Sequence, residues 1–231
     1  MANDLAQKRA TTLATAGRRG FETESGREDL IIPRTKLLQA LSPEVVDGDM
    51  KAGLVINSLT KEILPAEFIP VFVFKEYLRF NPTDAAKPGY DSTFPLGGLL
   101  WKTSDPLDPR VEETKFGPNG EKPLAMAVLN FFSYFPGQAM PIIVSFAKTS
   151  YKSGKQLYSL TKFTGGDMFS RKYTLTTKKE QNEAGQPYYI FQVNPAGLAE
   201  SEDYKAAEVL WETFSSKAQT LNVHEVASEE V

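Results

Sequence analysis

The segment FIPVFVFKEYLRF, residues 68–80, is dense in aromatic and β-branched residues and predicts the first long strand of the fold. From residue 124 onward, short strand-like runs alternate with turns that contain glycine or proline. Further strands are expected at residues 125–134, 141–148, 156–160, 169–178 and 188–193. Strands at this short, regular spacing favour an antiparallel sandwich or barrel over parallel α/β units.

Two segments outside this pattern concern helices. Apolar residues recur at steps of three and four between residues 202 and 221, which predicts one amphipathic helix that packs on the sheet. The run LYSLTKF, residues 157–163, fits both a strand and a helical turn, so both readings stay open there. The fold class is therefore mostly β (α+β), with a C-terminal amphipathic helix.

Composition divides the chain into three parts. Residues 1–29 are polar and are expected to form a flexible arm, and residues 30–221 form a single β-rich domain. Within that domain, residues 81–123 hold seven of the fifteen prolines and predict a long, irregular excursion. Residues 222–231 form an acidic tail.

The composition of the 231 residues excludes several classes of protein. The chain has no cysteine, which excludes disulfides, thiolate zinc sites and iron–sulfur clusters. Its one histidine, His224, lies in the polar tail, so a Ser-His-Asp enzyme or a two-histidine metal site is not expected. No apolar run is long enough to span a membrane, and the first residues do not resemble a secretory signal. We therefore expect a protein of the cytoplasm, that of the host cell if a phage encodes it.

The net charge of −3 conceals an uneven distribution. Residues 148–179 carry eight basic residues and one acid, whereas residues 200–231 carry eight acids and two lysines. Such an asymmetry favours a polyanion-binding face followed by an acidic tail, although two solvated surfaces of opposite sign would give the same pattern.

Cations and aromatic residues alternate through the basic segment, as single-stranded nucleic acid requires: lysines contact phosphates while bases stack on rings. The candidate contacts are Lys148, Tyr151, Lys152, Lys155, Tyr158, Lys162, Arg171, Lys172 and Tyr173. Taken singly, Tyr158, Phe163 and Phe169 fit the core better than a binding surface. Tyr151 and Tyr173 each adjoin a lysine and are expected to be exposed.

Two further groups extend this candidate surface. Lys75, Tyr77 and Arg79 alternate along the first long strand and therefore share one face. Trp101 could be a stacking platform. Because leucines surround it in the sequence, it could instead anchor the excursion on the domain.

Carboxylate pairs and sequence motifs give no catalytic candidate. Asp47 with Asp49, or Asp105 with Asp108, could hold a hard cation, but neither pair has EF-hand spacing and turns attract aspartate. The sequence also lacks the phosphate-binding and nucleophile-elbow motifs. No cofactor or metal is expected.

Several runs resemble a family of bacteriophage proteins encoded in the DNA-replication region. The resemblance covers roughly residues 28–210 and rests on residues 32–45, 51–53, 57–60, 68–72, 148–155 and 169–173. Members of that family are similar to phage single-stranded-DNA-binding proteins, which implies an OB-like antiparallel barrel and an acidic C-terminal end. By this resemblance the tail, with Glu225, Glu229 and Glu230, recruits replication proteins and competes with DNA for the basic groove.

The chain departs from the family pattern in two places. The excursion lacks the cysteine cluster of the relatives, so a zinc site does not carry over. The tail ends at Val231 without a long acidic run or a terminal aromatic residue, which weakens the docking role.

Three functions follow as hypotheses. The leading one is a non-enzymatic, sequence-tolerant single-stranded-DNA-binding protein of phage replication and recombination. The alternative is a phage structural or assembly protein that acts through protein–protein interfaces, and the third is a magnesium-dependent nuclease that uses Asp47 or Asp49. The sequence leaves open whether the chain forms a homo-oligomer.

Overall fold

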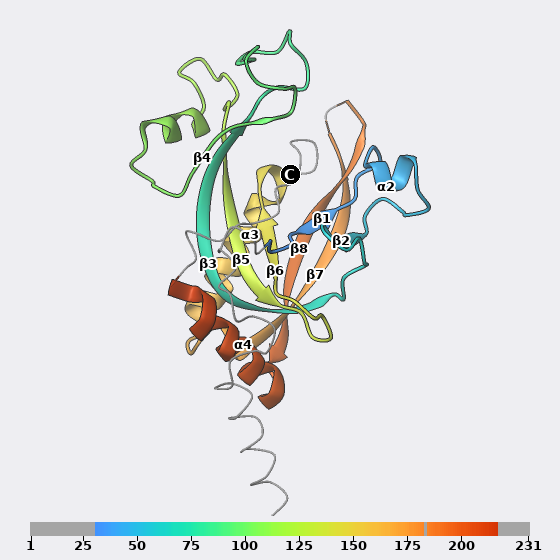
Figure 1. Ribbon diagram of the computed structural model, residues 1–231, viewed down its shortest axis with the longest axis vertical. Helices are drawn as coiled ribbons and strands as arrows, with labels where there is room; N and C mark the ends of the chain where they lie inside the picture. Colours follow the sequence, from blue (N-terminus) through green and yellow to red (C-terminus); the bar gives the residue numbers. More distant parts are fainter. Residues whose placement is uncertain (1–30, 183, 217–231) are drawn as a thin grey trace, which may run out of the picture. The chain divides into compact units, whose positions relative to one another are not determined.

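A sheet of six antiparallel strands organises the chain in the computed structural model, which describes residues 31–182 and 184–216 (Figure 1). Five strands follow the order β6-β5-β3-β7-β8, and β4 also pairs with β3. Their bounds are β3, Glu67–Phe80; β4, Leu99–Thr103; β5, Met126–Tyr134; β6, Ile142–Phe146; β7, Arg171–Gln181; and β8, Pro187–Leu198. The predicted mostly β, antiparallel fold is confirmed.

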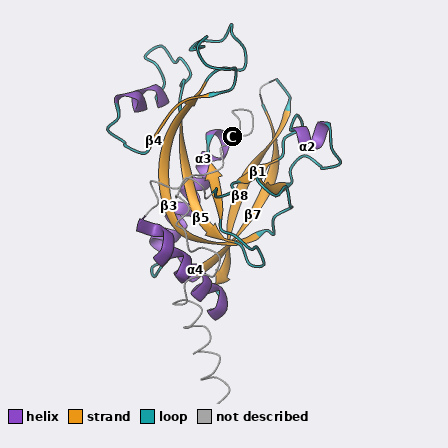
Figure 2. Cartoon of the chain, in the orientation of Figure 1, coloured by secondary structure: helices purple, strands orange, loops and turns teal. Residues whose placement is uncertain are grey.

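Strand β3, the segment from which the fold was predicted, is the centre of the sheet. Its first residues, Glu67 and Phe68, pair with β7, its middle pairs with β5, and its last residues pair with β4. Register shifts after Pro70 and after Arg79 interrupt this pairing, and Figure 2 shows the strand curving along its length. The sheet bends but does not close, because β6 and β8 do not pair with each other in the described part of the chain.

A helix lies beside the open edge of β8. The 3-10 turn η3, Lys148–Ser150, leads directly into α3, Tyr151–Phe163. The predicted strand at residues 156–160 is therefore wrong, and the helical reading of residues 157–163 is correct. Leu157 is fully buried among Phe146, Phe191 and their neighbours, and this packing selects the helix.

Two apolar clusters lie on opposite faces of the sheet. One contains Phe68, Phe131 and Phe146 and is covered by α3. The other contains Phe72 and Phe132, whose rings stack at 4.6 Å, and is covered by α4, Ser201–Phe214. The predicted helix at 202–221 is confirmed as far as Phe214, and its residues 217–221 lie outside the described residues.

Smaller elements complete the described chain. The short strands β1, Thr35–Leu37, and β2, Val55–Asn57, form a separate two-stranded sheet, with α2, Pro43–Val46, between them. The excursion contains β4 and a 3-10 helix, η2, Pro109–Thr114. It is therefore less irregular than predicted.

The domain boundaries can be compared only in part. Contacts divide the chain into two compact units, Met1–Ile31 and Ile32–Val231. The predicted arm and the acidic tail lie outside the described residues. Among the residues that are described, no helix has the length and apolar character needed to cross a membrane.

Candidate functional site

Helix α3 presents a basic face to solvent. Lys152, Lys155 and Lys162 are exposed, and Tyr158 lies on the same exposed side. The helix sequence YKSGKQLYSLTKF contains no acid. Because three lysines are carried by one rigid element without an internal counter-charge, the local potential is positive.

The start of α3 meets the middle of β3 in a cluster of two lysines and two tyrosines, hereafter the Lys75 cluster. The Lys75 ammonium lies 4.6 Å from the centre of the Tyr77 ring, and the Lys155 ammonium lies 5.7 Å from that of Tyr151. Burial opposes the charge of Lys75, but hydrogen bonding to the Tyr77 and Tyr151 hydroxyls outweighs it and raises the pKa of the ammonium. The structure thus brings the pair Lys75 and Tyr77 of β3 next to the pair Tyr151 and Lys155 of α3, about 75 residues further along the sequence.

The members of the Lys75 cluster differ in accessibility. Lys75 and Lys155 are exposed and Tyr151 is half-buried, whereas Tyr77 is only 7% exposed. Tyr77 therefore supports Lys75 and offers no free ring face, so the stacking rings on this side of the molecule are Tyr151 and Tyr158.

The second half of the basic segment lies elsewhere. Tyr173 is 1% exposed and packs against Phe68, so its predicted exposure is wrong. Successive residues of a strand point to opposite faces, so the charge of Lys172 says nothing about the face of its neighbour.

Lys172 itself is engaged by acids. Its ammonium lies 3.4 Å from carboxylate oxygens of both Glu67 and Glu200, which raises its pKa. Arg171, half-buried, precedes it at the start of β7.

Arg79 and Trp101 hold the excursion. The Arg79 guanidinium donates to the Gly89 carbonyl at 2.6 Å and to Glu113 at 2.7 Å. The Arg110 guanidinium lies 5.2 Å from the centre of the half-buried Trp101 ring. These contacts favour the anchoring role for Trp101 and tie Arg79 to the excursion.

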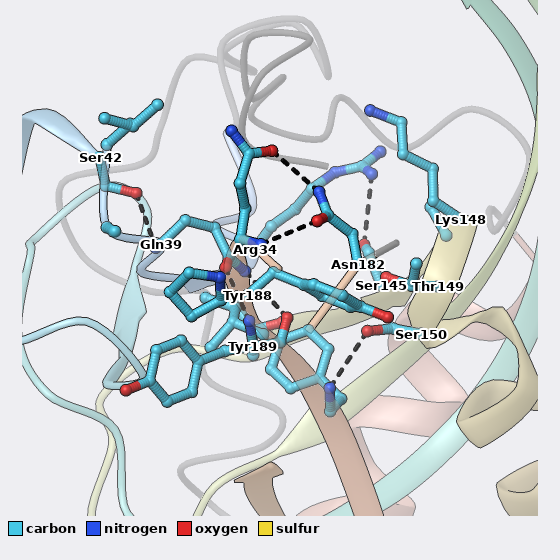
Figure 3. Close-up of a pocket in the computed structure, with 18 of the residues that line it drawn as sticks. Arg34, Gln39, Ser42, Ser145, Lys148, Thr149, Ser150, Asn182, Tyr188 and Tyr189 are labelled. Carbon is cyan, nitrogen blue, oxygen red and sulfur yellow. Dashed lines mark hydrogen bonds between the residues drawn. The ribbon is translucent and has the colours of Figure 1, made fainter. Parts of the chain in front are cut away.

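A pocket that the sequence did not indicate opens between three segments: the β1–α2 connection, the β6–η3 junction and the tip of the β7–β8 hairpin (Figure 3). It has a volume of about 860 Å³. Its polar and aromatic lining includes Arg34, Thr35, Gln39, Ser42, Ser145, Lys148, Thr149, Ser150, Asn182, Gln186, Tyr188 and Tyr189. Of the predicted site residues only Lys148 lines it. No sequence signal links these segments, because sheet topology alone brings them together.

A buried polar network forms one side of the pocket. Arg34 is 4% exposed; its guanidinium donates to Ser145 Oγ and to Glu76 Oε2, each at 3.2 Å. Asn130 bridges Glu76 and Ser145 through hydrogen bonds. The network fixes Arg34, which is the condition for a buried charge to be tolerated.

The backbone of the pocket contains one strained residue. Lys148 has φ of 45°, in the left-handed region that side chains other than glycine rarely adopt. Strained residues concentrate at functional sites, where the surrounding structure over-determines them.

The carboxylates considered for metal binding stabilise turns. Asp105 accepts the Leu107 N–H, and Asp108 accepts the Arg110 N–H and pairs with its guanidinium, which lowers the pKa of Asp108 to about 2. Within residues 31–182 and 184–216, no three histidine, cysteine or acidic side chains cluster as a metal site would require. His224 lies outside the described residues.

Comparison with known proteins gives one result. Residues 2–220 match the family described as Pam3 phage gp34-like protein. No curated protein and no solved structure matches the chain. The family match supports the bacteriophage origin expected from the sequence and assigns no activity.

Proposed function

The chain belongs to the Pam3 phage gp34-like protein family, and we propose that it is a non-enzymatic protein that binds single-stranded DNA with little regard to sequence. The basic face of α3 carries this proposal. A helix with three exposed lysines, no acid and adjacent tyrosines offers both interactions that single strands use.

The topology of the sheet supports an OB-type fold. Five strands follow the order β6-β5-β3-β7-β8, and α3 connects the third of them in sequence, β6, to the fourth, β7. The OB-fold is a five-stranded, partly open barrel, so the gap between β6 and β8 agrees with it. In that fold, the face of the second and third strands and the loops after the first and fourth strands take oligonucleotides. Here the loop after the fourth strand is the β7–β8 turn. The loop after the first strand is the excursion, which we expect to lie off the DNA because Arg79 and Asn81 tie it down on itself.

The arrangement implies a simple mode of binding. Lys75, Lys152, Lys155 and Lys162 contact phosphates, while Tyr151 and Tyr158 stack on bases. Neither interaction distinguishes one base from another, because every base has a π-face and every nucleotide a phosphate. Binding should therefore be sequence-tolerant and steeply dependent on salt.

Partners and location follow from the same proposal. The protein acts in replication or recombination in the cytoplasm of the host cell. Its acidic tail, which lies outside the described residues, docks replication proteins and competes with DNA. Binding along a strand is compatible with a homo-oligomer.

A structural or assembly role is the second candidate, and one observation favours it. The excursion exposes large apolar side chains, with Leu107 at 86% and Phe116 at 72% exposed. Such side chains are typical of protein–protein contacts.

Fluorescence anisotropy of a labelled oligothymidylate of 20 nucleotides (dT20) tests the leading proposal. We expect tight binding that falls steeply between low and high salt and exceeds binding to duplex DNA. Absence of binding at low salt contradicts the proposal. Light scattering after size exclusion would then show large assemblies if the second candidate is correct.

A further inference from the structure

The pocket at the start of η3 adjoins the proposed DNA surface. Lys148, Thr149 and Ser150 line it, and the next residue, Tyr151, belongs to the Lys75 cluster. A strand that follows α3 toward its N-terminus reaches the pocket without a gap in the chain. This inference rests on the proposed function and concerns what the pocket holds.

The lining has the electrostatics of an anion site. Among the described residues that line it there are two basic residues, Arg34 and Lys148, and no carboxylate, but the charge of Arg34 is already balanced by Glu76 at 3.2 Å. Helix α3 begins at Tyr151, directly after the lining residues Lys148, Thr149 and Ser150, so the positive end of its helix dipole lies next to the pocket. The first turn of α3 contains no acid and no side-chain cap.

One buried hydroxyl in the lining lacks a partner. Thr35 is 6% exposed, and its Oγ1 makes no hydrogen bond within the part of the chain that the structure describes. The oxygen has almost no accessible surface, so the unpaired hydroxyl is an energetic cost of the lining and not itself a contact for a ligand.

The aromatic part of the lining includes one half-exposed ring. Tyr188 and Tyr189 extend to opposite sides of β8, as Figure 3 shows. Tyr189 packs closely against Gly53, whereas Tyr188 is half-exposed and donates its hydroxyl to Glu180 at 3.2 Å. Tyr188 can therefore stack on a base.

The amides of the lining are already in use. Gln39 bonds both backbone groups of Tyr189, and Asn182 bonds Gln186. They are not free to read the hydrogen-bonding edge of a base, which agrees with tolerance of sequence.

We propose that this pocket receives one nucleotide of the bound strand, with its base stacked on Tyr188 and its phosphate held by Lys148. The pocket thereby fixes one nucleotide of the strand, while the face of α3 holds its neighbours.

Photo-cross-linking tests the occupant directly. A dT20 carrying one 5-iodo-deoxyuridine is irradiated with the full-length protein, and tryptic peptides are sequenced by mass spectrometry. We expect a cross-link at Tyr188, within residues 180–205, in addition to those on α3. Cross-links confined to Tyr151 and Tyr158 overturn the proposal.

Two variants measure the contribution of the pocket to affinity. Tyr188→Leu should weaken dT20 binding by on the order of 5- to 10-fold, because one stacked base is lost. Lys148→Gly should lower the salt slope by about 0.7 and fold normally, because glycine accepts the left-handed backbone. Tyr90→Leu, in the excursion, is the matched control and should bind as the wild type does.

The outcomes separate the two proposals. If both pocket variants bind dT20 with wild-type affinity, the pocket proposal is wrong while the DNA-binding function stands. No binding of dT20 by the wild-type protein overturns both.

Discussion

Gly154 of α3 lies directly on Phe146 of β6. A Cβ atom at position 154 would be 2.6 Å from the Phe146 Cβ, closer than such atoms can approach. Both residues are buried, so the helix docks here because one residue has no side chain.

Gly154→Ala should therefore destabilise the protein although alanine favours helices. Alanine gains about 1 kcal/mol of helix propensity, while overpacking costs about 1–3 kcal/mol. We expect a net loss of up to about 2 kcal/mol in the free energy of unfolding, measured in urea. Ser159→Ala, on the exposed face of α3, is the control and should stay within about 0.5 kcal/mol. A more stable Gly154→Ala variant contradicts the close approach.

Removal of two lysines from α3 should weaken DNA binding. In the Lys152→Gln, Lys155→Gln double variant, the salt slope of dT20 binding should fall by about 1.4, because each phosphate contact contributes about 0.7. Lys172→Gln is the matched control from the same basic segment. Its lysine is already paired with Glu67 and Glu200, so its slope should not change. If both variants lowered the salt slope equally, the DNA-binding surface would not be the exposed face of α3.

Asn81 should hold the excursion without a direct part in DNA binding. Its buried side chain donates to the carbonyls of Asp91, Phe94 and Pro95 and accepts the Asp91 N–H. Asn81→Ala should accelerate proteolysis within residues 82–98 while dT20 affinity stays within twofold. Asn119→Ala, in an exposed turn, is the control. A large loss of affinity would place the excursion at the DNA.

Acid should remove the contribution of Glu44 to stability. Burial raises the pKa of Glu44, but hydrogen bonds from Lys36 and Lys61 outweigh it and bring that pKa to about 2. A depressed pKa stabilises the fold above the unfolded value of 4.5, and this contribution is lost as the pH falls from about 5 toward 2. Glu44→Gln should cost about 3 kcal/mol at pH 7, since Lys36 is buried, and far less near pH 2.5. Urea titrations at both pH values measure this, with the exposed Glu62→Gln as control. An equal loss at both would contradict the ion-pair origin.

Deletion of residues 222–231 should tighten dT20 binding at low salt. The segment carries three acids and no lysine or arginine, so we expect it to compete with phosphates for cations. The effect should vanish at high salt, where charges are screened. If the deletion leaves the dT20 affinity at low salt unchanged, the tail does not compete with DNA.

The strands of the sheet could be predicted from the sequence, because alternation of apolar and polar residues and the turn residues between strands are visible in short stretches of chain. It did not decide residues 157–163, where Leu157 and Leu160 suit both periods. Burial of Leu157 between β6 and β8, and the absence of a side chain at Gly154, settle the helix, and both depend on residues distant in sequence.

The candidate site was predicted in part. Alternation placed Lys75 and Tyr77 on one face, and the structure joins them to Tyr151 and Lys155. Charge alone could not show that Lys172 is neutralised by Glu67 and Glu200. The pocket joins residues near 35, 148 and 188, whose meeting depends on strand order and leaves no local signal.

The outer edge of β8 is covered by side chains from other elements. The side chain of Gln39 forms hydrogen bonds with the N–H and the carbonyl of Tyr189. Ser150 accepts the N–H of Phe191, and Ser153 donates to the carbonyl of Phe191. Gln156 donates to the carbonyl of Val193. An incoming strand would have to displace these four side chains before it could extend the sheet. A filament built by continuing the sheet at this edge is therefore blocked.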